Sequence, residues 1–303
     1  MPSSHPIVIA VVVTYHPEAD TLARQLEALQ PQVVRVLVVD NGSKDEALAP
    51  VYAAGVGLIK YDHNLGLAAA QNRGIWHALV AGASHVLLMD QDSVPAADMV
   101  SRLLAALDTP GGQAVAAAGP RLFDPRSRTS LDHLRKEGSR FRQFPTPETA
   151  DAPLAVDHLI ASGCLIPATV LVQIGLMEEA LFIDAVDTEW CMRARAAGFG
   201  LVLETRAVLE HRLGERSLRL RTGMRRTRTL AFHSPARQYY MFRNNLLLCR
   251  RPYVDRAWRR LMAVVLPRRF VFCLICGPHR LACLRAMVAA IRDAWRGRSG
   301  ERH

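Results

Sequence analysis

The chain of 303 residues has room for one large domain with an appendage, and 50% apolar residues allow a sizeable core. Its net charge of +10 is unevenly placed, because 23 arginines and five carboxylates from Arg206 onward give +18 and leave −8 for residues 1–205. No uninterrupted apolar run is long enough for a transmembrane helix, which argues against a chain that spans the membrane as a helix.

The expected compartment is the cytoplasm. No Lys or Arg precedes the apolar run Ile7–Val13, so we expect no signal peptide. The six cysteines are scattered along the chain, which predicts free thiols in a reducing environment. The basic part of the chain predicts an anionic partner, such as a membrane surface or nucleic acid.

Strands and helices are expected to alternate along the first hundred residues. Helical spacing of apolar residues connects Leu22, Leu26 and Leu29, and a second helix is expected over Leu67–Val80. Before, between and after these helices lie short apolar runs that are typical of strands. These runs are Ile7–Val13, Val33–Val39, Gly57–Tyr61 and Val86–Met89. The alternation predicts an α/β protein with a doubly wound, mostly parallel sheet.

Polar groups follow all four of these strands. They are Thr14 with Tyr15, Asp40, Asn64, and Asp90 with Asp92. Ligands of open α/β sheets bind outside the carboxyl ends of the strands, so the coincidence predicts a ligand site. Asp90 and Asp92 could together hold a divalent ion that bridges nucleotide phosphates, although a solvated turn gives the same pattern.

Two further features suit a nucleotide. Asp40 could accept an N–H from a base or a hydroxyl from a ribose, although Asp-Asn-Gly-Ser is also a strong turn sequence. Gly66 and Gly74 allow the backbone to approach a ligand closely, or to cap and pack a helix. No Gly-x-Gly-x-x-Gly and no Walker-type loop is present, which disfavours a dinucleotide or a P-loop nucleotide.

In order and spacing, these motifs resemble the nucleotide-sugar half of family 2 inverting glycosyltransferases, and most nearly the rhamnosyltransferases of bacterial surface-polysaccharide synthesis. The resemblance covers roughly residues 7–250. The matching segments are Val12–Tyr15, Val39–Ser43, Asn64–Gly66, Asn72–Gly74 and Asp90–Asp92.

The resemblance implies a glycosyltransferase A-type fold, a Rossmann-like mixed sheet flanked by helices. It implies that Thr14, Tyr15 and Asp40 hold a pyrimidine base. Asp90 would contact the ribose region, and Asp92 would bind Mg²⁺ or Mn²⁺. The remaining nucleotide-side residues implied by the resemblance are Asn64, Gly66 and Asn72.

The middle of the chain is expected to form the acceptor side. Residues 124–153 are polar and basic, which predicts an exposed loop or hairpin, and a strand is expected over Val156–Ile160. By resemblance, the small-residue segment with Ser162 and Gly163 lines the acceptor site. Cys164 after it is expected to be a buried thiol.

The segment from Phe182 onward is expected to supply the general base. A helix through Ala197 is predicted, and the structural alternative for Asp187 is that it is the N-cap of this helix. Inverting transfer needs a carboxylate that takes the proton of the acceptor hydroxyl, and the resemblance places Asp187 at that position. Asp184 and Glu189 remain alternatives, and Glu189 is otherwise assigned to the acceptor side.

Two later residues have a functional and a structural interpretation. His211 could complete the metal site or hold the leaving diphosphate, or it could be a structural histidine. Arg243 lies in a Tyr-, Arg- and Asn-rich segment that resembles one packed beneath the acceptor site of rhamnosyltransferases. The alternative for Arg243 is helix packing.

From Trp258 to Trp295, apolar residues alternate with Arg in helical register, which predicts basic amphipathic helices in a bilayer interface. A zinc site is a minor alternative for the residues Cys273, Cys276, His279 and Cys283. Nucleic acid is disfavoured, since the aromatic and basic interleaving of an RNA-binding sheet is absent.

We therefore expect a catalytic domain over residues 1–215 and a basic helical extension over residues 216–303. The expected activity is metal-dependent inverting transfer of a sugar, L-rhamnose from dTDP-L-rhamnose, to a glycan or lipid-linked acceptor. The enzyme would be attached peripherally to the cytoplasmic face of the membrane. A sugar nucleotidyltransferase and a non-catalytic membrane-associated protein are the alternatives. The sequence does not determine the oligomeric state.

Overall fold

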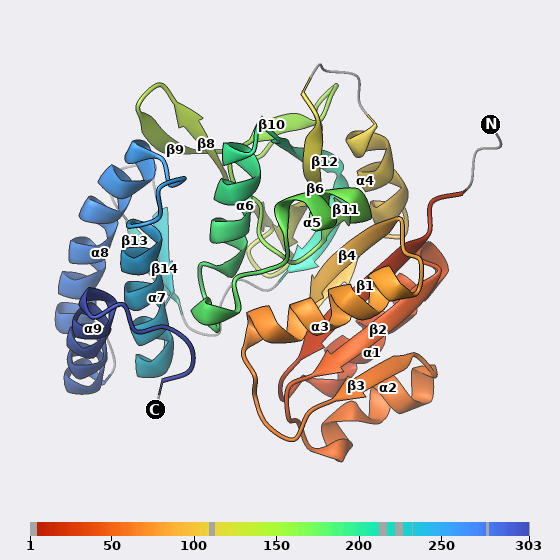
Figure 1. Cartoon of the computed structure of the whole chain (residues 1–303), viewed down its shortest axis with the longest axis horizontal. Coiled ribbons are helices and arrows are strands. Elements are labelled where there is room, and N and C mark those ends of the chain that lie inside the picture. The colour runs from red at the N-terminus through yellow and green to blue at the C-terminus, as the bar shows by residue number, and fades with distance from the viewer. Residues whose placement is uncertain are drawn as a thin grey trace.

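The computed structural model describes residues 5–108, 113–211, 217–221, 227–231, 233–276 and 279–302. Within them, a ten-stranded sheet runs in the order β10-β12-β6-β11-β4-β1-β2-β3, with β5 paired to β12 and β7 to β6 (Figure 1). The strands are β1 (Val8–Thr14), β2 (Arg35–Asp40), β3 (Gly57–Lys60), β4 (His85–Asp90), β5 (Ser93–Pro95), β6 (Val115–Asp124), β7 (Thr129–Ser130), β8 (His133–Glu137), β9 (Arg140–Phe144), β10 (Leu154–Val156), β11 (Cys164–Pro167), β12 (Gly200–His211), β13 (Ser217–Arg221) and β14 (Thr227–Ala231).

The helices cover both faces of the sheet and gather at one end of it (Figure 1). They are α1 (Ala19–Leu29), α2 (Ala49–Ala54), α3 (Leu67–Val80), α4 (Met99–Leu107), α5 (Ala168–Ile174), α6 (Val186–Ala196), α7 (Pro235–Leu248), α8 (Arg256–Cys276) and α9 (Arg280–Trp295). The expected alternation of four strands with helices is confirmed, and α3 has the predicted bounds.

The sheet is mixed. β1 is parallel to β2 and β4, whereas β11 is antiparallel to β4 and β6. The strand expected over Val156–Ile160 was wrong, because pairing with β12 ends at Val156 and the next strand begins at Cys164. Small residues at 161–163 therefore lead into a central strand. The expected hairpin within residues 124–153 is present as β8 paired with β9.

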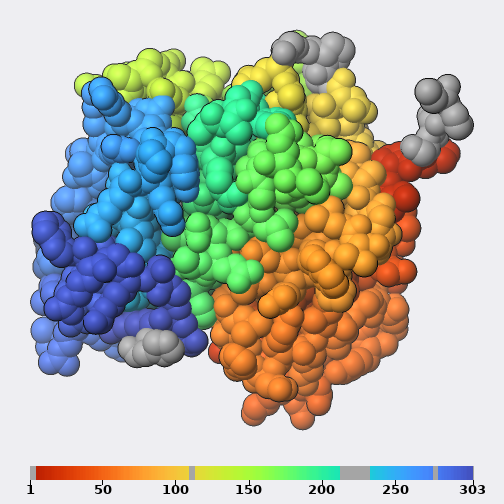
Figure 2. Space-filling view, viewed as in Figure 1, coloured from red at the N-terminus to blue at the C-terminus, as the bar shows by residue number. Residues whose placement is uncertain are grey.

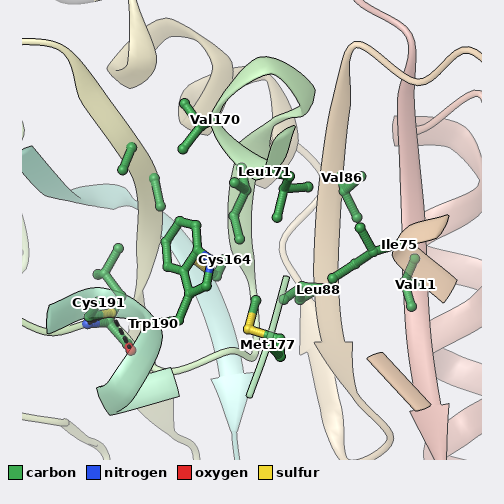
Figure 3. Close-up of a cluster of buried hydrophobic side chains, with 14 of the residues drawn as sticks. Val11, Ile75, Val86, Leu88, Cys164, Val170, Leu171, Met177, Trp190 and Cys191 are labelled. Atoms are coloured by element: carbon green, nitrogen blue, oxygen red, sulfur yellow. Dashed lines mark hydrogen bonds between the residues drawn. The ribbon is translucent and has the colours of Figure 1, made fainter. Parts of the chain in front are cut away.

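The core has a layer on each face of the sheet, as the alternation along β1 requires. Val11 faces the layer built with α3, α5 and α6, and Val12 faces the layer built with α1 and α4. Figure 3 shows the first layer, in which Trp190 of α6 and Leu171 of α5 lie near Cys164 of β11. Cys164 is buried, as expected, and burial raises the pKa of its thiol well above the ordinary value.

The C-terminal helices form a third core that includes side chains from earlier parts of the chain. Phe141 of β9 and Met192 of α6 pack with residues of α7, α8 and α9, and Figure 2 shows these segments lying against the middle of the chain. The expected domain boundary at residue 215 lies outside the described residues. Because this core is shared, the helices after that boundary are packed against the catalytic domain. In the described part of the chain, none of the helices has the length and apolarity needed to cross a bilayer.

Candidate functional site

The parallel register of the central strands brings three predicted site residues to one edge. Thr14 at the end of β1 pairs with Asp40 at the end of β2, and Val13 pairs with Asp90 at the end of β4. Polar groups that lie up to 76 residues apart in sequence therefore meet at the carboxyl edge, where α/β sheets bind ligands.

Asp40 is fully buried and fixes the turn after β2. Its Oδ1 accepts hydrogen bonds from the Thr14 hydroxyl at 2.8 Å and the Ser43 hydroxyl at 2.6 Å. Its Oδ2 accepts from the backbone N–H of Gly42 at 3.1 Å and of Ser43 at 2.7 Å. About four acceptor positions of a carboxylate are then in use. Contact with a base N–H would require one of the two hydroxyls to give up its place.

Gln91 ties the ends of β1 and β4 together. Its Oε1 accepts from the backbone N–H of Tyr15 at 2.6 Å, and its Nε2 donates to the carbonyl of Tyr15 at 3.1 Å. The Tyr15 ring itself is 46% exposed beside this link. In the sequence, Gln91 lies between the two expected site residues Asp90 and Asp92. The structure shows that Gln91 fixes the backbone of Tyr15, whose side chain is exposed.

The turn at Asn64 and Gly66 is clamped to the Asp40 turn. The Asn41 amide donates to the carbonyl of Gly66 at 3.1 Å, and Asn64 Oδ1 accepts from the N–H of Gly66 at 2.8 Å. A Cβ atom on Gly66 would meet the Phe182 ring at 2.6 Å, and its φ is 92°. Glycine is therefore required here by contact with the segment before α6.

Asn72 was expected on the nucleotide side but is a buried brace in this structure. Its Nδ2 donates to the carbonyl of Met177 and to Glu179 Oε1, each at 2.9 Å. Its Oδ1 accepts from the N–H of Met177 at 2.8 Å. These bonds join α3 to the segment that leads toward α6 and use the hydrogen-bonding capacity of the amide in a structural role.

Asp92 and His211 come together although they are far apart in sequence. Antiparallel pairing of β5 with β12 puts His211 opposite Ser93, and His211 Nδ1 lies 3.6 Å from Asp92 Oδ1. The Ser93 hydroxyl is 2.8 Å from the same nitrogen and 2.9 Å from the Ser162 hydroxyl. The exposed fraction of the side chain is 50% for Asp92 and 16% for His211.

Asp90 lies in a group of carboxylates. Burial, followed by the nearby charges of Asp92 and Asp187, raises the pKa of Asp90 from 3.8 to about 7, while Arg237 opposes the shift. The Ser162 hydroxyl accepts the backbone N–H of Asp90 at 3.3 Å, which places this predicted acceptor-side residue beneath the aspartates. The site therefore holds negative charge that a cation would stabilise.

Asp187 presents one oxygen to the site. Its Oδ1 accepts from the backbone N–H of Thr188 at 2.7 Å and lies 4.0 Å from His158 Nε2, which is also 3.0 Å from the Thr188 hydroxyl. Its Oδ2 has no hydrogen-bond partner among the residues described. The alternative role of Asp187 as N-cap is wrong, because Ala185 is the N-cap and Asp187 lies in the first turn. His158 was not anticipated, since nothing in its local sequence marks it.

The two alternative bases are held differently. Glu189 is 1% exposed, and Arg193 Nε at 2.8 Å and the Tyr253 hydroxyl at 2.6 Å both donate to its Oε1. A carboxylate fixed in this way braces α6 and does not open to a substrate. Asp184 accepts from Arg237 Nε at 3.2 Å, and burial is the main cause that raises its pKa.

The segment from 181 to 185 is held in an unusual conformation. Phe182, Asp184 and Ala185 have φ values of 65°, 63° and 63°, which are costly for residues with a side chain. The fully buried Asn244 amide donates to the carbonyls of Leu181, Ile183 and Asp184 at 2.7–2.9 Å. These bonds stabilise the segment that leads into the helix bearing Asp187.

Arg243 supports the same segment from inside the protein. It is 1% exposed and donates to the carbonyl of Leu181 at 3.2 Å and of Gly300 at 2.5 Å. Its guanidinium also stacks near the rings of Tyr239 and Tyr240. Of the two interpretations of Arg243, the structure favours packing, since the side chain has no path to a bound acceptor.

Two other expected features are structural or lie partly outside the described residues. Gly163 has φ of 79°, and a Cβ atom there would meet Pro120 at 2.5 Å, so packing explains this glycine. Among the four residues of the alternative zinc site, Cys273 and Cys283 are buried and His279 is exposed. The side chain of Cys276 is not described. Among the residues described, no group of three His, Cys, Asp or Glu is placed to hold a metal ion.

Comparisons with known proteins follow this geometry. The model of "Glycosyl transferase family 2" matches residues 10–166. The chain is 32% identical over 253 residues to dTDP-rhamnosyl transferase RfbF of Shigella flexneri, covering 82% of this chain and 81% of that protein.

Solved structures share the fold. S. aureus TarS 1-349 in complex with UDP-GlcNAc has a TM-score of 0.59 at 17% identity, covering 96% of this chain and 81% of that one. GalNAc-T7 with UDP, GalNAc and Mn²⁺ has a TM-score of 0.59 at 14% identity, covering 91% of this chain but only 59% of that one. The mixed-sheet fold expected from the sequence is confirmed.

Proposed function

Because the chain belongs to glycosyl transferase family 2 and is a glycosyltransferase, we propose that it transfers L-rhamnose from dTDP-L-rhamnose with inversion and with the help of a divalent metal. The observation that carries the proposal is the meeting of Asp90, Asp92 and Asp187 at the end of β4. Carboxylates placed there serve both the diphosphate side and the acceptor side of one reaction centre.

The donor assignment rests on the relative and on the first two strands. RfbF of Shigella flexneri is named a dTDP-rhamnosyl transferase. In the proposal, the exposed Tyr15 ring stacks on the base, and Thr14 and Asp40 select a pyrimidine through its N3–H. Asp40 does so if the base displaces the Thr14 or Ser43 hydroxyl from Oδ1. Asn64 and Gly66 support the nucleotide side through the hydrogen bond that the Asn41 amide donates to the carbonyl of Gly66. Asp90 contacts the ribose region.

The metal is proposed at Asp92 and His211. The atoms Asp92 Oδ1 and His211 Nδ1, 3.6 Å apart, fit two neighbouring ligands of one Mg²⁺ or Mn²⁺ ion. Mg²⁺ commonly takes one or two protein ligands and completes its shell with water and substrate phosphates. GalNAc-T7, which shares the fold, was solved with Mn²⁺. When bound, such an ion neutralises charge on the departing diphosphate.

Asp187 is proposed as the general base. Its Oδ1 is fixed by the N–H of Thr188, and the free Oδ2 takes the proton of the acceptor hydroxyl as that oxygen attacks the anomeric carbon. The bond from the anomeric carbon to the diphosphate oxygen breaks on the opposite face, which inverts the configuration. Ser162 and Gly163 lie beneath the centre on the side assigned to the acceptor.

The acceptor is proposed to be a glycan or lipid-linked glycan at the cytoplasmic face of the membrane, with the enzyme bound peripherally to that face. Apolar side chains project from α8 and α9 although these helices are rich in Arg. Among them, Ile275 is 62% exposed, Leu281 71% and Trp295 80%. An apolar face with arginines around it is typical of helices that bind anionic lipid.

The test is a panel of nucleotide sugars with purified protein, with and without Mg²⁺ or Mn²⁺. Calorimetric binding and slow hydrolysis should be strongest for dTDP-L-rhamnose and should weaken on removal of the metal. Release of pyrophosphate from dTTP and a sugar phosphate would instead indicate a nucleotidyltransferase. Absence of binding to every nucleotide would indicate a non-catalytic protein.

A further inference from the structure

An arginine lies close to the carboxylates of the site. Arg237, in the first turn of α7, places Nε 3.2 Å from Asp184 Oδ1, and its charge also acts on Asp90. Its side chain is 51% exposed, and its two terminal nitrogens have no partner in the part of the chain that the structure describes. Those nitrogens can bind a bidentate anion.

A second arginine stands behind the first. Arg269 of α8 donates from Nε to Gln238 Oε1 at 2.9 Å, while its buried Nη2 has no hydrogen-bond partner among the described residues. Asp184 Oδ2 is also buried without one. Buried donors and acceptors are normally paired, so Arg269 keeps an unsatisfied donor close to the pair of Arg237 and Asp184.

The two guanidiniums repel each other. Burial, then Arg269 and then Arg237, lowers the pKa of His233 from 6.5 to about 4. Burial and Arg237 also lower the pKa of Arg269. His233 is therefore neutral at physiological pH, and Asp184 is the carboxylate that pairs with Arg237. Two like charges held together with one carboxylate leave an excess of positive charge next to the reaction centre.

The other side of the centre has the opposite charge. Asp90, Asp92 and Asp187 would repel a diphosphate, and one divalent ion at Asp92 and His211 offsets only part of that repulsion. A diphosphate at the end of β4 therefore needs positive charge from a second direction. Arg237 is the described cation whose charge reaches both Asp90 and Asp184.

We propose that Arg237, with Arg269 behind it, binds the diphosphate of the donor nucleotide. The proposal rests on the proposed function, since it places the phosphates of that same donor. It explains why α7 and α8, which follow the family-matched residues 10–166, pack against the catalytic domain. Their role at the site is to supply positive charge to a leaving group.

The test compares thymidine, dTMP and dTDP by calorimetry in the presence of Mg²⁺. Wild-type affinity should rise with each phosphate. Arg237→Gln should lower affinity for dTDP by roughly 10- to 100-fold and leave thymidine unchanged, because a charge-assisted contact is lost only with phosphate. Arg268→Gln, which removes an exposed arginine beside Arg269, is the matched control and should leave all three affinities unchanged.

Two variants separate direct contact from damage to the ion pair. Asp184→Asn breaks the pair with Arg237 but keeps both guanidiniums, so dTDP should bind at least as well as to wild type. Arg237→Lys keeps the positive charge but not the planar guanidinium with its paired N–H donors. It should therefore recover part of the lost dTDP affinity. If Asp184→Asn lost as much dTDP affinity as Arg237→Gln, the arginine would be structural and the inference wrong.

Three further outcomes distinguish failure of the inference from failure of the proposed function. If wild type bound dTDP and Arg237→Gln bound it equally well, the inference would be overturned while the proposed function stood. A rise in KM for a diphosphate-linked lipid acceptor alone would also overturn it, because the phosphates at Arg237 would then belong to the acceptor. If wild type bound no nucleotide, the proposed function itself would fail.

Discussion

Phe182 packs against Gly66 with no space for a side chain between them. A Cβ atom on Gly66 would lie 2.6 Å from the Phe182 ring and 2.9 Å from its carbonyl oxygen. The same carbonyl accepts a hydrogen bond from the N–H of Ala68 at 3.3 Å. The nucleotide-side turn after β3 and the segment that leads to Asp187 are therefore in direct contact. The proposed donor side and the proposed base therefore share one continuous packing arrangement.

Gly66→Ala is predicted to destabilise the protein by about 2–6 kcal/mol: about 1–3 kcal/mol from strain, because φ of 92° with ψ of 157° suits only glycine, and the rest from overpacking against Phe182. Urea unfolding measures the change. Gly82→Ala is the control, since Gly82 has φ of 82° but nothing within 4 Å of a Cβ atom, so it should show the strain alone. Equal losses for the two variants would mean that contact with Phe182 is unimportant.

Asp187→Asn is predicted to reduce rhamnosyl transfer by roughly 10²- to 10⁴-fold while dTDP binding stays at the wild-type level, because a general base acts in the transition state. Transfer is measured with the donor selected by the nucleotide-sugar panel. Asp20→Asn, at an exposed position of α1, is the control. Near-normal transfer by Asp187→Asn would move the base to Asp184, since Glu189 is buried in its bonds to Arg193 and Tyr253.

The features that sequence could predict are those set by local pattern. Apolar spacing alone determined the bounds of α3, Leu67–Val80, and the strands that end at Thr14, Asp40 and Asp90 were found from apolar runs followed by turn residues. Parallel pairing then forces those ends to the same edge of the sheet. The catalytic and ligand-binding roles assigned to the residues there stay predictions.

The features that sequence could not predict depend on contacts between distant segments. Asp187 follows a local rule for an N-cap, but bonds from Asn244 stabilise a left-handed backbone at Asp184 and Ala185 and start the helix earlier. Asn72 and Glu189 lie in motifs that suggested a functional site, but each is hydrogen-bonded to structural partners far away in the sequence. No local pattern reveals those partners. The position of His211 beside Asp92 results from the pairing of β5 with β12.

The His233 imidazole is predicted to titrate near pH 4 in the free protein. Its folded pKa lies below the ordinary 6.5, so the unfolded chain takes up a proton first and stability falls as the pH drops from 6.5 toward 4. Between pH 6.5 and 5 this costs up to about 2 kcal/mol, at about 1.4 kcal/mol per pH unit. His233→Gln should show a smaller loss over that range.

Arginine neighbours are the second cause of the His233 shift, after burial. An NMR titration of the imidazole should therefore give a higher pKa in Arg237→Gln than in wild type. Arg268→Gln, which does not act on His233, should leave the titration unchanged. An unaltered pKa in Arg237→Gln would show that this guanidinium does not face His233.

The membrane prediction uses side chains that the structure shows to be exposed. The sequence placed Phe270, Phe272 and Trp258 in the bilayer interface, but these rings pack into the third core, and Trp258 lies edge-on to Phe141. The exposed residues are Val264, Val265, Val271 and Ile275 on α8, and Leu281, Val288, Ile291 and Trp295 on α9. These exposed side chains, and not the packed aromatic rings, are the residues proposed to contact the membrane.

Truncation of the C-terminal helices is a poor test of the membrane proposal, because these helices support other parts of the fold. Arg243 donates to the carbonyl of Gly300, and the Tyr239 hydroxyl donates to Asp293 at 2.9 Å, so α9 supports α7. Because Arg243 also holds Leu181, removing the C-terminal residues would disturb the segment before Asp187. Point substitutions at exposed positions avoid this damage.

Wild-type protein is predicted to sediment with phosphatidylglycerol vesicles at low salt and more weakly with phosphatidylcholine vesicles. Each arginine near an anionic leaflet contributes about 1 kcal/mol, screened over a Debye length of about 8 Å at physiological salt, whereas the apolar contribution is insensitive to salt. High salt should therefore weaken binding without eliminating it.

The double variant Val271→Ser with Ile275→Ser should lose the share of vesicle binding that remains at high salt. Val172→Ser on α5, which is 77% exposed, is the matched control and should bind as wild type does. If wild-type protein stayed in the supernatant with anionic vesicles at low salt, these helices would not be a membrane surface.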